Sequence, residues 1–185
     1  MKYKAIVRNL VFAFVSAAFS LFAKADAGVT VDGVDVSAGS GTGWTYEDGI
    51  VMFTGAGPFV VSGSSDGILF RQNAADVTVI ASGLNVSGLS RGSDQSTIRL
   101  DEGQNLTLLL EGENRIVNGN GYCCAINVRP GATLVIDKKA GLTDEAATLY
   151  AESSAYEAAG IGGIYDYCPD AGTIEICGGT VSARG

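Results

Sequence analysis

The chain has 185 residues and a formal net charge of −8, with 20 Asp and Glu residues against 12 Lys and Arg residues. This acidic balance argues against nucleic acid or an anionic membrane as a partner, because both need a basic patch on the protein. The sequence contains no histidine, which removes imidazole zinc sites and the commonest general base from consideration.

Residues 1–27 have the pattern of an export signal peptide. Lys2, Lys4 and Arg8 precede an apolar stretch of about 13 residues, and small residues around Ala25 and Ala27 then offer cleavage sites. The stretch is shorter than the ~20 residues that a membrane-spanning helix needs, and an uncleaved anchor is the alternative. Cleavage after Ala25 would leave 8 basic against 20 acidic residues, a net charge of −12. We expect a protein that is secreted or displayed on the cell surface.

The second half of the chain repeats itself about every 28 to 35 residues. Residues 96–108 return as residues 124–136, so that Ile98 matches Ile126 and Leu106 matches Leu134. A looser copy precedes them, in which Ile68 is matched to Ile98, and a fourth copy follows, in which Thr173 is matched to Thr133. Self-similarity at such a period indicates a stacked array with an elongated surface.

Each copy contains three short apolar runs that alternate with period two, which predicts an all-β structure. The expected strands are residues 68–70, 77–79, 84–86, 98–100, 106–110, 116–117, 126–128, 134–136, 149–151, 160–163, 174–176 and 181–183. Three strands per turn predict a parallel β-helix of about four turns over residues 64–185. Residues 28–63 are expected to form entry and capping strands, near 50–54 and 59–61. A short helix within 142–159 is an alternative at one place, and we expect the array to be incomplete at its C-terminal end.

Alignment of the copies predicts a ladder of Arg71, Asp101 and Arg129, each three residues after a matched isoleucine. An ion-paired surface ladder is the simpler interpretation. The alternative is a groove for an acidic sugar, with Arg71 or Arg129 on its carboxylate.

Two pairs of aromatic residues are candidate platforms for sugar rings: Trp44 with Tyr46, and Tyr165 with Tyr167. Packing within a cap is the alternative for the first pair. Asp166 and Asp170 lie in the enlarged corner of the fourth copy and are the candidate calcium ligands, with solvated surface acids as the alternative.

Four cysteines follow the signal peptide, and an even number in an oxidising compartment indicates disulfides. Cys123 and Cys124 are poorly placed to bond each other, so we expect bridges from this pair to Cys168 or Cys177, with free thiols as the alternative. No nucleophile elbow or phosphate loop is present. We therefore expect no enzymatic activity.

Several segments resemble repeats of secreted bacterial β-helix proteins of the carbohydrate-binding domain-containing type, which are similar in shape to pectate lyases. The resemblance rests on residues 44–63, 106–114, 159–163 and 172–183. It implies a right-handed β-helix, a polysaccharide or cell-surface glycan as the ligand, and bound calcium. A carbohydrate-binding or adhesin-type protein is the leading hypothesis. A fragment of a polysaccharide lyase or hydrolase, and a purely structural spacer, are the alternatives.

Overall fold

The computed structural model describes residues 28–88, 95–119, 123–154, 158–164 and 170–185. The fold is all-β and contains parallel strands in two sheets, with one 3-10 turn, η1 (Val36–Ala38). The expected signal peptide lies outside the described residues. Within these ranges no helix is long and apolar enough to cross a membrane.

The larger sheet has nine strands and includes, from each copy, the strands that follow the first apolar run. Its strands are β1 (Val29–Val31), β2 (Val34–Asp35), β6 (Phe59–Ser65), β8 (Asp76–Ser87), β10 (Asn105–Asn118), β12 (Thr133–Lys138), β13 (Ala147–Ser153), β15 (Thr173–Ile176) and β16 (Thr180–Arg184). The smaller sheet holds β3 (Ser40–Gly41), β4 (Trp44–Glu47), β5 (Ile50–Phe53), β7 (Leu69–Gln72), β9 (Ile98–Leu100), β11 (Ile126–Val128) and β14 (Ile161–Gly162).

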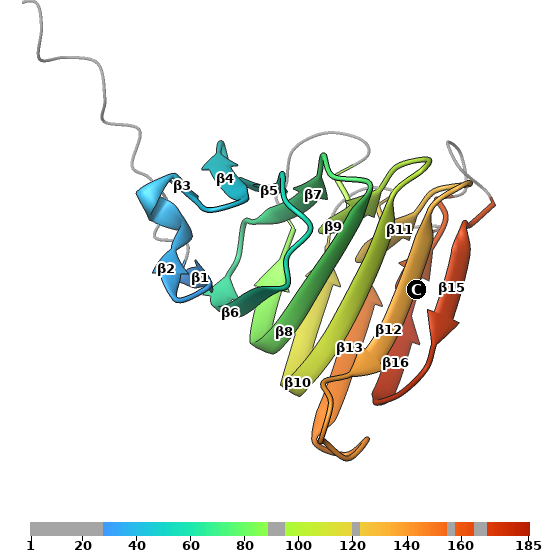
Figure 1. Ribbon diagram of the computed structural model, residues 1–185. Helices are drawn as coiled ribbons and strands as arrows, with labels where there is room; N and C mark the ends of the chain where they lie inside the picture. Colours follow the sequence, from blue (N-terminus) through green and yellow to red (C-terminus); the bar gives the residue numbers. More distant parts are fainter. Residues whose placement is uncertain (1–27, 89–94, 120–122, 155–157, 165–169) are drawn as a thin grey trace, which may run out of the picture.

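From β5 onward the chain alternates between the two sheets, and each strand pairs in parallel with its counterpart in the next copy. The smaller sheet runs β5–β7–β9–β11–β14, and the larger runs β6–β8–β10–β12–β15, with β13 between β10 and β16. The colours of Figure 1 therefore change steadily from blue to red along the stack. Below, the first repeat is β7 and β8, the second is β9 and β10, the third is β11 to β13, and the fourth is β14 to β16.

The predicted register is confirmed for the second, third and fourth repeats. Ile98 pairs with Ile126, and Leu106 pairs with Leu134. Thr133 pairs with Thr173, as the match between the third and fourth copies predicts. Gly103 and Gly131 occupy the same place in two copies of the sequence, which predicts a bend with an unusual backbone angle, and their φ angles of 77° and 79° confirm it. Only glycine adopts such angles without strain.

The predicted register of the first repeat is wrong in the smaller sheet. Phe70, and not Ile68, pairs with Ile98. A shift of two residues leaves the inward-facing set unchanged, because side chains alternate with period two. Ile68 and Phe70 are both buried, so the apolar pattern fits either register and packing decides between them.

In the first two repeats the second and third predicted strands form one continuous strand, β8 in the first repeat and β10 in the second. β8 and β10 each run through the corner, where Gly83 and Gly112 have positive φ and the register shifts between Glu111 and Arg115. In the third repeat residues 139–146 separate β12 from β13. The strand predicted at 149–151 is confirmed within β13, Ala147–Ser153, where alternate residues are buried, and the alternative of a helix within 142–159 is wrong over this range. The alternation of that segment outweighs its helix-forming composition.

The core lies between the sheets and follows the period of two. In β10 the inward side chains are Leu106, Leu108 and Leu110, and each is at most 4% exposed. They pack as one continuous cluster with the equivalent residues of the neighbouring repeats. The expected N-terminal strands are present as β5 and β6; β4 pairs with β5, and β1 with β6, in antiparallel fashion.

Candidate functional site

The predicted ion-pair ladder exists in part, around Asp101. Its Oδ1 lies 3.1 Å from Nη1 of Arg129, and its Oδ2 lies 3.2 Å from Nη2 of Arg99. Arg129 follows β11 and Arg99 lies in β9, so one carboxylate joins two repeats. The three side chains are 27 to 37% exposed, and such pairs contribute roughly 0 to 1 kcal/mol each.

Arg71 does not belong to this ladder, and that prediction is wrong. The shifted register moves it away from the position that Asp101 and Arg129 share. Arg71 is 8% exposed, and its Nη1 donates hydrogen bonds to the carbonyls of Phe70 at 2.7 Å and Ser96 at 2.9 Å. The guanidinium is therefore held against the backbone, where a carboxylate in solution reaches it poorly.

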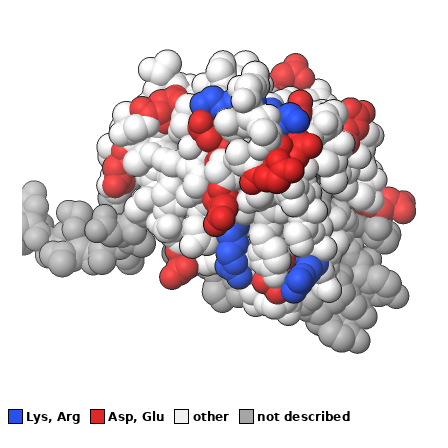
Figure 2. All heavy atoms as spheres, turned by 90° about the horizontal axis from the view of Figure 1, so that it is seen from below, with Lys and Arg blue, Asp and Glu red and all other residues white. Residues whose placement is uncertain are grey.

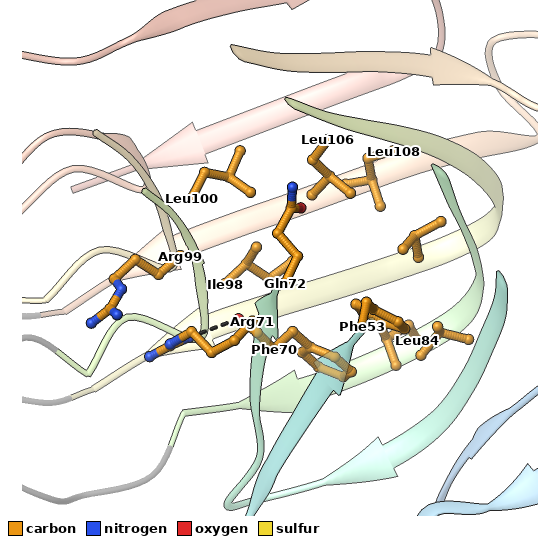
Figure 3. A pocket seen from close by; sticks show the side chains of 12 residues that line it. Phe53, Phe70, Arg71, Gln72, Leu84, Ile98, Arg99, Leu100, Leu106 and Leu108 are labelled. Carbon is orange, nitrogen blue, oxygen red and sulfur yellow. Dashed lines mark hydrogen bonds between the residues drawn. The ribbon is translucent and has the colours of Figure 1, made fainter. Parts of the chain in front are cut away.

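A small cavity lies inside the fold beside Arg71, as Figure 3 shows. Phe53, Phe70, Leu84 and Leu106 are among its apolar lining residues, while the charged ends of Arg71 and Arg99 point away from them. Its volume is about 20 Å³, which admits about one water molecule. This cavity is too small to receive a sugar ring.

Trp44 and Tyr46 share a face of β4, as their spacing predicts, but this face points inward. Trp44 is 2% exposed, and its indole covers Gly41, where a Cβ would collide with the ring. Tyr46 is half-buried, and burial, followed by the charge of Asp35, raises the pKa of its hydroxyl. The expectation that Trp44 stacks on sugars is therefore wrong, because the ring fills the N-terminal part of the core.

The other candidates from the enlarged corner are described only in part. Tyr165, Asp166, Tyr167 and Cys168 lie outside the described residues. Asp170 is described and is exposed. Among the described ranges no three acidic or cysteine side chains come together as a metal site, so the predicted calcium ligands stay a prediction.

The cysteines lie in different surroundings. Cys123 and Cys124 are buried, whereas Cys177 is exposed after β15. The sulfur of Cys123 accepts a hydrogen bond from the N–H of Gln95 at 2.9 Å, and the thiol of Cys124 donates one to the carbonyl of Gly163 at 3.0 Å. No disulfide joins these three within the described part of the chain. The predicted bridge to Cys177 is thus absent there, and a bridge to Cys168 is a prediction about a residue outside it.

One surface cluster escaped the sequence analysis: Arg115, Tyr150, Glu152 and Arg184 on the outer face of β10, β13 and β16. The guanidinium carbons of Arg115 and Arg184 lie 5.5 and 5.6 Å from the centroid of the Tyr150 ring. Glu152 Oε2 lies 3.4 Å from Nη2 of Arg115. The signal for this cluster is in the outward positions of the third strands, which the repeats at the first and second strands do not cover.

The cluster is notable because acidic side chains predominate elsewhere. Figure 2 shows one such face, seen from below the view of Figure 1, where red side chains outnumber blue ones. On the polypeptide as a whole, 20 acidic residues face 12 basic ones. With two arginines and one glutamate, the cluster around Tyr150 carries one net positive charge, as does the group of Arg99, Arg129 and Asp101.

No protein-family model matches this sequence, and no curated protein or solved structure matches it either.

Proposed function

We propose that this chain is an exported, non-catalytic protein that folds as a right-handed parallel β-helix and binds polysaccharide at the cell surface, as an adhesin-type module. Export is inferred from the signal-peptide pattern of residues 1–27. The β-helix is inferred from strands that alternate between two sheets and pair in parallel with the next repeat.

The observation that carries this proposal is the register of outward side chains from repeat to repeat. Asn85, Arg115 and Tyr150 pair across three neighbouring strands, and Ser182 continues the row. Neighbouring strands are ~4.8 Å apart, so such a row offers polar and aromatic groups at constant spacing. A repetitive surface of this kind suits a repetitive ligand, since successive units of a polymer can make similar contacts.

Calcium is the proposed ion, on the ground that acidic side chains and loop carbonyls are its usual ligands. Asp170 is the exposed candidate among the described residues. The proposal assigns calcium a stabilising role and no part in a reaction.

The test is retention of the purified exported chain on immobilised neutral and acidic polysaccharides, with calcium and with a chelator. We expect saturable retention with no change in polymer length, measured by size-exclusion chromatography of the eluted glycan. A shortened glycan, or unsaturated uronate ends that absorb ultraviolet light, would indicate a lyase or hydrolase instead. Absence of retention by a sample with a β-type circular dichroism spectrum would favour a structural spacer.

A further inference from the structure

The cluster around Tyr150 places two guanidinium groups beside one aromatic ring. Arg115 is the register partner of Tyr150, and Arg184 is the register partner of Glu152. Both guanidinium groups lie within 5.6 Å of one aromatic ring. Three parallel strands therefore bring two cations to one ring on the outer face of the larger sheet.

The ring reduces the cost of holding these cations in place. A free arginine side chain loses considerable rotamer entropy when it binds a ligand. Contact with the face of a tyrosine attracts the guanidinium and restricts it beforehand. The Arg115 side chain is 50% exposed, so its donors remain accessible to an anion in solution.

Glu152 is a carboxylate already resident in this site. It is 31% exposed and contacts Arg115 at 3.4 Å, longer than a strong charge-assisted hydrogen bond. Two arginines and one glutamate leave a single positive charge. A ligand anion must displace Glu152 or share its partners.

We propose that the cluster of Arg115, Tyr150 and Arg184 binds the sulfate ester of a sulfated glycan. This inference rests on the proposed polysaccharide-binding function and names the ligand class. A carboxylated sugar would replace Glu152 with a group of the same chemistry and the same desolvation cost. The exchange would therefore add little binding free energy. A sulfate monoester is more weakly hydrated than a carboxylate, which matches the weakly hydrated guanidinium group. Its three terminal oxygens also accept hydrogen bonds from more than one direction.

The experiment measures dissociation constants of the full exported chain for dextran, carboxymethyl dextran and dextran sulfate at physiological ionic strength. The three polymers share one backbone and differ in their charged group. We expect dextran sulfate to bind most tightly. Arg115→Gln and Arg184→Gln should each weaken it roughly tenfold, the scale of a lost hydrogen bond to a charged group. Glu152→Gln should strengthen binding by removing the resident competitor.

Two further variants separate this site from general electrostatic attraction. Lys139→Gln removes one positive charge that is paired with Glu111 and is not part of the cluster, and it should leave dextran sulfate binding unchanged. Tyr150→Leu removes the aromatic face and should bind dextran sulfate more weakly than the unaltered chain. Thermal unfolding of every variant checks that the fold persists.

A folded chain that carries both Arg115→Gln and Arg184→Gln should bind dextran sulfate weakly, and the proposal fails if it binds as tightly as the unaltered chain does. The proposal also fails if the unaltered chain binds carboxymethyl dextran as tightly as dextran sulfate. It also fails if a folded sample does not bind dextran sulfate. Any of these failures, in a chain that still retains another polysaccharide, would overturn this inference and leave the proposed function standing. Failure to bind every polysaccharide would overturn both.

Discussion

The side-chain Oδ1 of Asn114 accepts a hydrogen bond of 2.9 Å from the backbone N–H of Leu84, one repeat away. On its other side the Asn114 amide donates to the carbonyl of Thr148, in the following repeat, at 3.2 Å. Asn114 is 3% exposed and lies at the corner where β10 shifts register against β8. The amide thus replaces the backbone bonds that the irregular corner loses.

Asn114→Leu should destabilise the fold by about 2 to 4 kcal/mol, because it leaves buried backbone groups of two repeats without partners. Asn105→Leu is the matched control, since Asn105 is exposed and bonds only the Asp76 side chain through its amide; it should change stability by less than about 0.5 kcal/mol. Urea unfolding measures both. Equal effects would show that the corner does not depend on the amide.

Asp144 should make stability sensitive to acid. Its Oδ1 accepts hydrogen bonds from Nζ of Lys138 at 2.7 Å and from the N–H of Gly179 at 3.0 Å. The Lys138 bond and then the Gly179 bond lower the pKa of the Asp144 carboxyl. The contribution of the Asp144 carboxylate to folding stability is therefore fully present above the ordinary aspartate pKa. It is lost as the pH falls through the lowered pKa of the folded protein. Melting temperature measured from neutral to strongly acid pH should fall less in Asp144→Asn than in the unaltered chain. Parallel curves would contradict this.

Leu108 and Leu109 should differ sharply although they are adjacent. Leu108 is 1% exposed and faces the core, while Leu109 is half-buried on the outer face. Leu108→Ala should cost about 2 to 5 kcal/mol through lost burial and the cavity left behind. Leu109→Ala should cost less than about 1 kcal/mol. The reverse order in denaturant unfolding would show that β10 has the wrong face inward.

Trp44 is the sole tryptophan of the sequence, so its fluorescence reports on the N-terminal part of the core. Because the ring is 2% exposed, we expect emission at short wavelength and little quenching by iodide. Unfolding should shift the emission to longer wavelength, and an added glycan should leave it unchanged. Strong iodide quenching of the native protein would restore Trp44 as a surface platform.

The thiols should differ in reactivity under native conditions. Cys177 is exposed and should be alkylated rapidly, whereas Cys123 is buried and should react only on unfolding. Mass spectrometry of tryptic peptides measures both. Protection of Cys177 that is removed by a reductant would instead show that it is in a disulfide, as the cysteine pattern predicts.

The sequence determined where most strand segments lie and much of the register between them. Period-two alternation and self-similarity are local properties, and they correctly placed Ile98 against Ile126 and Thr133 against Thr173. The shared glycines at 103 and 131 correctly predicted corners with positive φ. These features follow from chain geometry, which is the same in every copy.

Only the tertiary structure decided which alternative the apolar pattern takes and which side chains meet. Ile68 and Phe70 both satisfy the alternation, so the packing of neighbouring repeats selected Phe70 and removed Arg71 from the ladder. Trp44 and Tyr46 share a face of their strand whether that face points to solvent or to the core. The antiparallel pairing of β4 with β5 turns it toward the core. Arg115 and Tyr150 are 35 positions apart and meet because β13 pairs with β10. This pairing depends on residues 139–146, which connect β12 to β13 and whose length the repeat does not specify. Contacts between repeats depend on how the connecting segments set the register, and that information is spread over the whole stack.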